Sequence, residues 1–128
     1  MSDEGVPFDV VSHQLDGMAV VTVSGEIDLT TSDSLQGSIE RTTSPTVVLD
    51  LSRVAFLDSS GIRAIDRGRR RLASEGRSFL IVSPPGTPSA WTLRVAGFDR
   101  ELVVETLDGV RAAKPSDGLT RSARTGIR

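Results

Sequence analysis

The feature that most constrains the fold is a nearly continuous apolar run from Thr46 to Leu51, in the middle of the chain. A run of this length with little polar content is typical of a strand buried on both faces of a sheet. Val54 to Leu57 continue in the same character, and the polar segment Asp58-Ser59-Ser60-Gly61 follows. An amphipathic segment begins immediately afterwards. A buried strand, a short polar loop and a helix in this order indicate an α/β domain.

Two strands and a short helix are predicted before this run. Residues 8–14 alternate in part between apolar and polar, and residues 18–23 are rich in β-branched side chains. Asp16-Gly17 between them is a strong signal for a hairpin turn. Thr30 or Thr31 then offers an N-cap for a helix of about three turns that ends before Pro45.

The elements expected after the loop alternate between helix and strand. Residues 62–75 form a helix in this interpretation, stopped by Gly76. Residues 79–82 form a further buried strand, and Thr87-Pro88 begins a third helix that runs to Gly97. Residues 98–105 return to the core as a last strand. We expect Ile62, Ile65, Leu72 and Ala73 to mark the buried face of the 62–75 helix.

These elements predict an α/β fold with a mixed β-sheet of about five strands, an N-terminal hairpin and helices packed against the sheet. The apolar period disappears from about Gly109 onward. We therefore expect one domain over residues 6–108 and a disordered basic tail over residues 109–128, which carries Arg121, Arg124 and Arg128.

Composition excludes several classes of protein. The 128 residues include no cysteine, so disulfides, thiol nucleophiles and zinc–thiolate sites are impossible. The acidic N-terminus lacks the apolar core of a signal peptide, and no apolar run approaches the roughly 20 residues of a membrane span. A net charge of -2 gives no general attraction to nucleic acid. We expect a cytoplasmic protein with no membrane or direct nucleic-acid partner.

The sequence contains few candidate catalytic residues. His13 is the one histidine, it lies in the first predicted strand, and a surface or edge-strand position is expected for it. The sequence contains no nucleophile elbow, P-loop, dinucleotide fingerprint or HExxH zinc motif. A metal site would need Asp28, Asp50 and Asp58 to converge, and no signature supports that. We expect no enzyme, no metal and no cofactor.

Asp58-Ser59-Ser60-Gly61 is the strongest candidate for a functional site. Asp58 or Ser59 can serve as the N-cap of the following helix, which leaves the Ser60 hydroxyl on the first turn near unpaired backbone N–H groups. Taken alone, three capping residues in a row also fit a simple helix start.

The residues Val48 to Ile62, which include Val54-Ala55-Phe56-Leu57-Asp58-Ser59-Ser60-Gly61, resemble the signature of STAS domains, and in particular bacterial anti-sigma factor antagonists. Gly25-Glu26-Ile27-Asp28 after the second strand matches this family, as does the ending from Thr92 to Leu102 with Gly97-Phe98. The resemblance covers roughly residues 8–107.

The resemblance implies a partner-switching regulator. In proteins of this type the unmodified form binds an anti-sigma factor with serine kinase activity and releases the sigma factor, as in stress responses. Phosphorylation then abolishes binding, and a serine phosphatase restores it. On this chain the resemblance makes Ser60 the phosphate acceptor, with Asp58 supporting recognition and Ser59 as a secondary contact. Gly61, Ile62, Arg63 and Arg67 complete the expected partner-binding surface.

Departures from the family pattern concern the helix that follows. Asp66 stands where these domains usually bury an apolar residue, and Gly68 weakens the helix by about 1 kcal/mol relative to alanine. The set Arg63, Arg67, Arg69, Arg70 and Arg71 forms either a solvated face or a docking surface. Trp91 is assigned to the core, with a partner anchor as the alternative.

Two other functions remain open. The chain could be a STAS adaptor subunit of a larger assembly, such as a stress-sensing or transport complex, or a small-ligand or nucleotide sensor. An adaptor would form a stable complex indifferent to phosphate. A sensor would be stabilised by its ligand without any protein partner.

Overall fold

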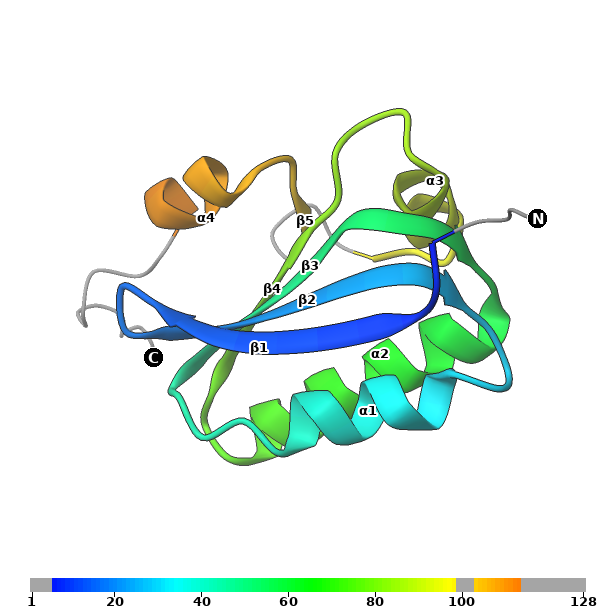
Figure 1. The fold of residues 1–128 in the computed structure, drawn as a ribbon. Coiled ribbons are helices and arrows are strands. Elements are labelled where there is room, and N and C mark those ends of the chain that lie inside the picture. Colours follow the sequence, from blue (N-terminus) through cyan, green and yellow to red (C-terminus); the bar gives the residue numbers. More distant parts are fainter. Residues whose placement is uncertain (1–5, 99–102, 114–128) are drawn as a thin grey trace.

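The computed structural model describes residues 6–98 and 103–113, and its elements alternate between strand and helix (Figure 1). They are, in chain order, β1 (Asp9–Leu15), β2 (Met18–Ile27), α1 (Ser32–Glu40), β3 (Thr46–Leu57), α2 (Ser59–Ser74), β4 (Ser78–Val82), α3 (Pro88–Val95), β5 (Val103–Val104) and α4 (Leu107–Ala113). The five strands form one sheet in the order β1-β2-β3-β4-β5. Only β1 is antiparallel to its neighbour, and the other pairs are parallel. The predicted mixed sheet with an N-terminal hairpin is confirmed.

The hairpin turn has the backbone that its sequence predicts. Asp16 has φ 53° and Gly17 has φ 79°, so both central residues lie in the left-handed region. Two such residues make a type I′ turn, whose twist matches that of the flanking strands. Leu15 therefore pairs directly with Met18, and this pair fixes the register of β1 against β2.

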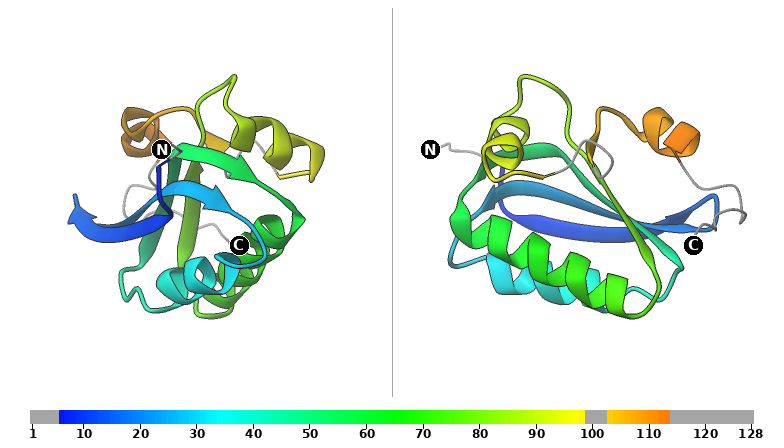
Figure 2. Two further views of the ribbon diagram at one scale, coloured as in Figure 1. Left: turned by 45° about the vertical axis from the view of Figure 1, so that its right-hand side comes forward. Right: turned by 180° about the vertical axis from the view of Figure 1, so that it is seen from behind.

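The sheet carries its main core on one face. Helices α1 and α2 cover that face (Figures 1 and 2), where their Leu35, Ile39, Ile65 and Leu72 pack against the strands. A smaller cluster lies on the other face, where Val110 of α4 packs among Val20, Val48 and Leu80. The first half of β3 contributes to both clusters, so its continuous apolar run is the result of burial on two sides.

Helix α2 agrees with its prediction except at one residue of its buried face. It begins at Ser59, directly after the predicted cap Asp58, and Ile65 and Leu72 are buried as expected, whereas Ala73 is exposed. Two glycines of α2 are buried instead. A Cβ on Gly68 would lie 2.9 Å from Cγ2 of Ile39, so the missing side chain allows α1 and α2 to pack closely.

Helix α3 begins where it was predicted to begin, but a different side chain from the predicted one packs into the core. The Thr87 side chain accepts a hydrogen bond from the Ala90 N–H, and Pro88 follows at the first helical position. Leu93 is the residue of α3 that joins the main core. Trp91 is 59% exposed, so its assignment to the core was wrong.

The C-terminal end of the domain lies beyond the predicted boundary. The last strand is β5, only two residues long within the predicted range of 98–105, and residues 99–102 lie outside the described part. Helix α4 then continues to Ala113, and Val110 is fully buried. The boundary at residue 108 was therefore placed too early. The rest of the predicted tail, 114–128, lies outside the described residues. Among the described residues no helix is long and apolar enough to cross a membrane.

Candidate functional site

Asp58 caps α2 and arranges the residues that follow it. Its backbone is extended (φ -107°, ψ -171°), and its Oδ1 accepts hydrogen bonds from the N–H groups of Ser60 at 2.9 Å and Gly61 at 3.2 Å. Ser59 and Ser60 consequently occupy the first helical turn. Of the two caps predicted, the structure uses Asp58.

The side chain of Ser60 is available for chemistry. Ser60 is half-buried, Ser59 is exposed, and neither hydroxyl forms a hydrogen bond with the part of the chain that the structure describes. The capping bond to Ser60 uses its backbone N–H, not its hydroxyl. The cap therefore fixes the backbone of Ser60 and leaves its hydroxyl oxygen without a partner among the described residues.

Gly61 allows the start of α2 to approach the sheet. A Cβ at this position would overlap Cδ1 of Leu57 and lie 2.7 Å from Cγ2 of Ile27. Both side chains are buried, at 3% and 0% exposure, so neither has room to move. Glycine is required here by close packing against the ends of β2 and β3.

A second loop, between β2 and α1, lies against the first. The Asp58 N–H donates to the Ile27 carbonyl at 3.2 Å, which joins the two loops directly. Asp28 holds its own loop: its Oδ1 accepts the Thr30 N–H at 2.9 Å and the Thr30 hydroxyl at 2.7 Å, and its N–H donates to Thr31 Oγ1. These hydrogen bonds, first those from Thr30, lower the pKa of Asp28.

Ser60 opens onto a small hollow between α1 and α2. The hollow has a volume of about 90 Å³, and its lining includes Ser60, Arg63, Arg67 and the loop residue Leu29. A larger and more open groove of about 490 Å³ runs along the other side of the helix start, between Ser59, Ile62 and Phe98. The site residues predicted from the sequence lie at the N-cap of α2 and on its first nine residues: Asp58, Ser59, Ser60, Gly61, Ile62, Arg63 and Arg67.

The arginines of α2 fall into two groups. Arg69 and Arg70 both bind the Asp66 carboxylate, at 2.7 and 2.9 Å, and Arg71 pairs with Glu75 at 3.0 Å. Within the described residues Arg63 and Arg67 form no ion pair or hydrogen bond. Asp66, which was noted as a departure from the family pattern, is a surface carboxylate that neutralises part of this face. The uncompensated positive charge therefore lies next to Ser60.

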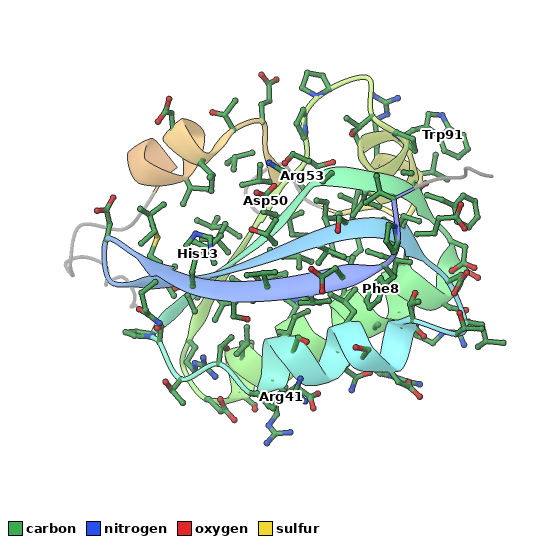
Figure 3. The ribbon with its side chains drawn as sticks, in the orientation of Figure 1. Phe8, His13, Arg41, Asp50, Arg53 and Trp91 are labelled. Atoms are coloured by element: carbon green, nitrogen blue, oxygen red, sulfur yellow. The ribbon has the colours of Figure 1, made fainter. Side chains whose placement is uncertain are left out.

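Exposed apolar side chains gather at the same end of the molecule. Leu29 is 78% exposed, Phe56 46%, Trp91 59% and Val95 65%, and we call these four residues the apolar rim. Leu29 follows the end of β2, Phe56 precedes the end of β3, and α3 lies at the same end of the sheet as the start of α2 (Figures 1 and 2). Trp91 points away from the body of the protein (Figure 3). Exposed apolar surface of this kind marks interaction sites.

The sequence interpretation missed most of the apolar rim. Leu29 was the one available signal, because it is an apolar residue inside the polar segment Asp28-Leu29-Thr30-Thr31. Phe56 and Val95 could not be separated from core residues by their pattern alone. The alternative interpretation of Trp91, an exposed anchor, agrees with its exposure.

The remaining candidates for chemistry are dispersed. His13 lies exposed on the edge strand β1, as predicted. Asp50 is buried in β3 and accepts the Ser52 N–H at 3.0 Å, while Asp28 and Asp58 are bound to the backbone of their own loops. Within residues 6–98 and 103–113 no group of three or more His, Cys, Asp or Glu side chains could hold a metal ion.

Comparison with known proteins gives one family and several solved structures. The family model for the STAS domain matches residues 9–113. An anti-sigma factor antagonist from Mycobacterium paratuberculosis is similar over 86% of this chain and 97% of its own, with a TM-score of 0.77 and 29% identity. The unphosphorylated form of the anti-sigma factor antagonist SpoIIAA is similar over 83% of this chain and 97% of its own, with a TM-score of 0.64 and 18% identity. A sulfate transporter family protein from Wolinella succinogenes is similar over 78% of this chain and 87% of its own, with a TM-score of 0.66 and 20% identity.

Proposed function

Since the chain belongs to the STAS domain family, we propose that it is an anti-sigma factor antagonist that phosphorylation of Ser60 switches off. In its unmodified form it binds an anti-sigma factor with serine kinase activity and thereby frees a sigma factor. The kinase modifies Ser60, binding is lost, and a serine phosphatase restores it. The likeness to the antagonist from Mycobacterium paratuberculosis, at 29% identity over nearly the whole of that chain, supports the general function.

One observation carries this proposal: at a helix start, the Ser60 hydroxyl has no hydrogen-bond partner among the described residues. The hollow that it faces is also lined by Arg63 and Arg67, which form no ion pair with those residues, and by Leu29 of the apolar rim. A protein substrate needs an acceptor oxygen that a kinase can reach, and an interface needs apolar surface to bury. Both lie at the same end of this domain.

The fold can accept a phosphate at this position. A phosphoserine carries about -1.5 to -2 charges at neutral pH. The N-terminus of α2 presents backbone N–H groups and the positive end of the helix dipole, and Arg63 and Arg67 line the hollow onto which Ser60 opens. Two carboxylates oppose the added charge: Asp58 at the cap and Asp33, which lines the same hollow. We therefore expect the phosphorylated domain to keep its fold.

The effect of phosphate then falls on the interface. A doubly charged group placed against a partner must be desolvated or repelled, and this costs about 2–5 kcal/mol when no matching charge receives it. Such a cost corresponds to a loss of affinity of about 30-fold or more. Phosphate acts here as a blocking group, with no change of shape required.

Intact-mass analysis tests the proposal directly. The purified protein is incubated with ATP and the candidate anti-sigma kinase, and the wild type and the Ser59→Ala variant should each gain one phosphate. Ser60→Ala should gain none and should still bind the kinase as tightly as the unmodified wild type in titration calorimetry. Ser59→Ala is the matched control, because Ser59 lies one residue earlier on the same turn.

Two results would contradict the proposal. Phosphate uptake by Ser60→Ala would place the acceptor elsewhere. A complex of equal affinity before and after phosphorylation would instead indicate an adaptor subunit, in which the same surface binds a partner permanently.

A further inference from the structure

The outer edge of β1 is an open sheet edge. Strand β1 is the first strand in the sheet order, and β2 is its one neighbour in the sheet. Figure 2 shows no helix or strand beside its outer side among the described elements. Such edges are usually protected by lysine, proline or a bulge. Residues 9–15 contain no Lys, Arg or Pro, and β1 pairs with β2 without a register shift.

The hairpin turn determines which backbone groups face outward. Leu15 and Met18 flank a two-residue turn and form a hydrogen-bonded pair. Hydrogen-bonded residues alternate along an antiparallel ladder, so Leu15, His13 and Val11 use their N–H and C=O groups towards β2. The backbone N–H and C=O groups of Val10, Ser12 and Gln14 consequently point away from the sheet, towards solvent.

A groove runs along this edge. It has a volume of about 460 Å³ and lies between β1 and the end of α1, and its lining includes Val10, Ser12 and Gln14 on one side and Ser38, Arg41 and Thr43 on the other. One wall therefore offers free backbone donors and acceptors, and the opposite wall is polar. This combination fits an extended strand with short side chains.

A second copy of β1 matches the edge with one particular register. A two-fold axis at Ser12 places Ser12 of one copy opposite Ser12 of the other, and Val10 of each copy opposite Gln14 of the other. The outward-pointing backbone groups of all three residues in each strand can then form hydrogen bonds with those of the other strand. Shifting the register by two residues in either direction loses one of these matches. The partner's Val10 side chain then enters the groove beside Gln14.

The opposite face of the pair is complementary as well. Val11, which is 53% exposed, would lie opposite His13 of the second copy and diagonal to its Val11. Asp9 would lie diagonal to His13 of the second copy, within reach of an interaction between opposite charges when the imidazole is protonated. Pairing of the two strands would bury the exposed Val11 side chains, and no two β1 residues of like charge would lie opposite each other.

We propose that this protein forms a two-fold symmetric dimer by antiparallel pairing of β1 with β1 of a second copy, which gives a continuous sheet through both subunits. Ser12 pairs with Val21 of β2, and the loop that carries Ser60 lies beyond the end of β2 at Ile27, about 20 Å further along the strand. The dimer therefore leaves both Ser60 sites open. The proposal is independent of the proposed function.

Charge substitution at the two-fold axis tests the dimer. Sedimentation equilibrium of the wild type from about 5 to 500 µM should show a monomer–dimer equilibrium. Ser12→Lys and Ser12→Glu each place like charges opposite each other, and each should raise the dimer dissociation constant about fivefold or more. A 1:1 mixture of these two variants should associate at least as well as the wild type, a result that misfolding cannot produce. Ser34→Lys, on the exposed surface of α1, is the control and should behave as the wild type.

Covalent trapping gives a second test, because the chain has no cysteine of its own. Hydrogen-bonded residues of antiparallel strands have Cα atoms about 5.5 Å apart, within the range of a disulfide. Ser12→Cys should form a covalent dimer under mild oxidation much faster than Ser34→Cys. A wild type that stays monomeric throughout, Ser12→Lys that dimerises as well as the wild type, or equal rates of cross-linking for the two cysteine variants would each overturn the proposal.

Discussion

Replacing Gly61 by alanine should destabilise the protein, although alanine is the better helix former. Gly61 lies on the first turn of α2, where a Cβ would overlap Leu57 and come within 2.7 Å of Ile27 Cγ2. Forcing a methyl group into a closely packed site costs about 1–3 kcal/mol. The propensity gain on replacing glycine in a helix is at most about 1 kcal/mol.

The displacement of Gly61 has a second cost. Its N–H is one of the two that Asp58 Oδ1 accepts, at 3.2 Å, and a shift of the helix start lengthens that bond. Loss of an N-cap costs about 1 kcal/mol. Overpacking and capping loss together exceed the propensity gain, so Gly61→Ala should lower the free energy of unfolding by about 1–3 kcal/mol.

Urea denaturation measures this difference, and the chain supplies a matched control. Gly37 also lies inside a helix, α1, but a Cβ there would approach only the end of the exposed Arg41 side chain. Gly37→Ala should therefore raise the free energy of unfolding by up to about 1 kcal/mol. Opposite signs for these two glycine-to-alanine changes are the expected result. A Gly61→Ala protein as stable as the wild type would refute the argument from close packing.

Two further predictions concern the surface. Leu29→Ser should weaken binding of the anti-sigma partner about tenfold and leave the urea midpoint unchanged, because this side chain is 78% exposed, whereas Ala73→Ser on the exposed side of α2 should alter neither quantity. The guanidinium groups of Arg77 and then Arg71 lower the pKa of Glu75 below its ordinary 4.5, so this stabilisation is present above pH 4.5 and is lost as pH falls through the lower folded-state value. The stability difference between wild type and Glu75→Gln should therefore shrink in acid, and a difference that grows below pH 4.5 would contradict the assignment.

The elements that the sequence predicted well are those with a local physical cause. The hairpin follows from Asp16-Gly17, because a two-residue turn needs positive φ at both positions. The start of α3 follows from two adjacent residues. Thr87 caps the helix, and the ring of Pro88 fixes its own φ at a helical value, whatever the surrounding residues are. The position of Ser60 follows in the same way, because the cap is formed by the adjacent Asp58.

The features that could not be predicted depend on contacts between distant elements. On the buried face of α2 the sequence missed Gly68 and included the exposed Ala73, because Gly68 contributes by lacking a side chain and a glycine gives no apolar signal. Trp91 was assigned to the core because aromatic residues are usually buried, whereas α3 uses Leu93 for that contact. Helix α4 packs mainly through Val110 and Leu107, too few residues to produce a period in the sequence.

The parallel pairing of β3 on both sides makes the strand that precedes Ser60 rigid. Residues 47–50 are paired with β2 and with β4, and the loop with Ser60 continues directly from the other end of this strand. A strand held in this way cannot shift when one side chain is modified. We therefore expect no slow refolding step between the active and inactive forms. In the proposed function, the response time is then set by the lifetime of the complex and by the enzymes that add and remove phosphate.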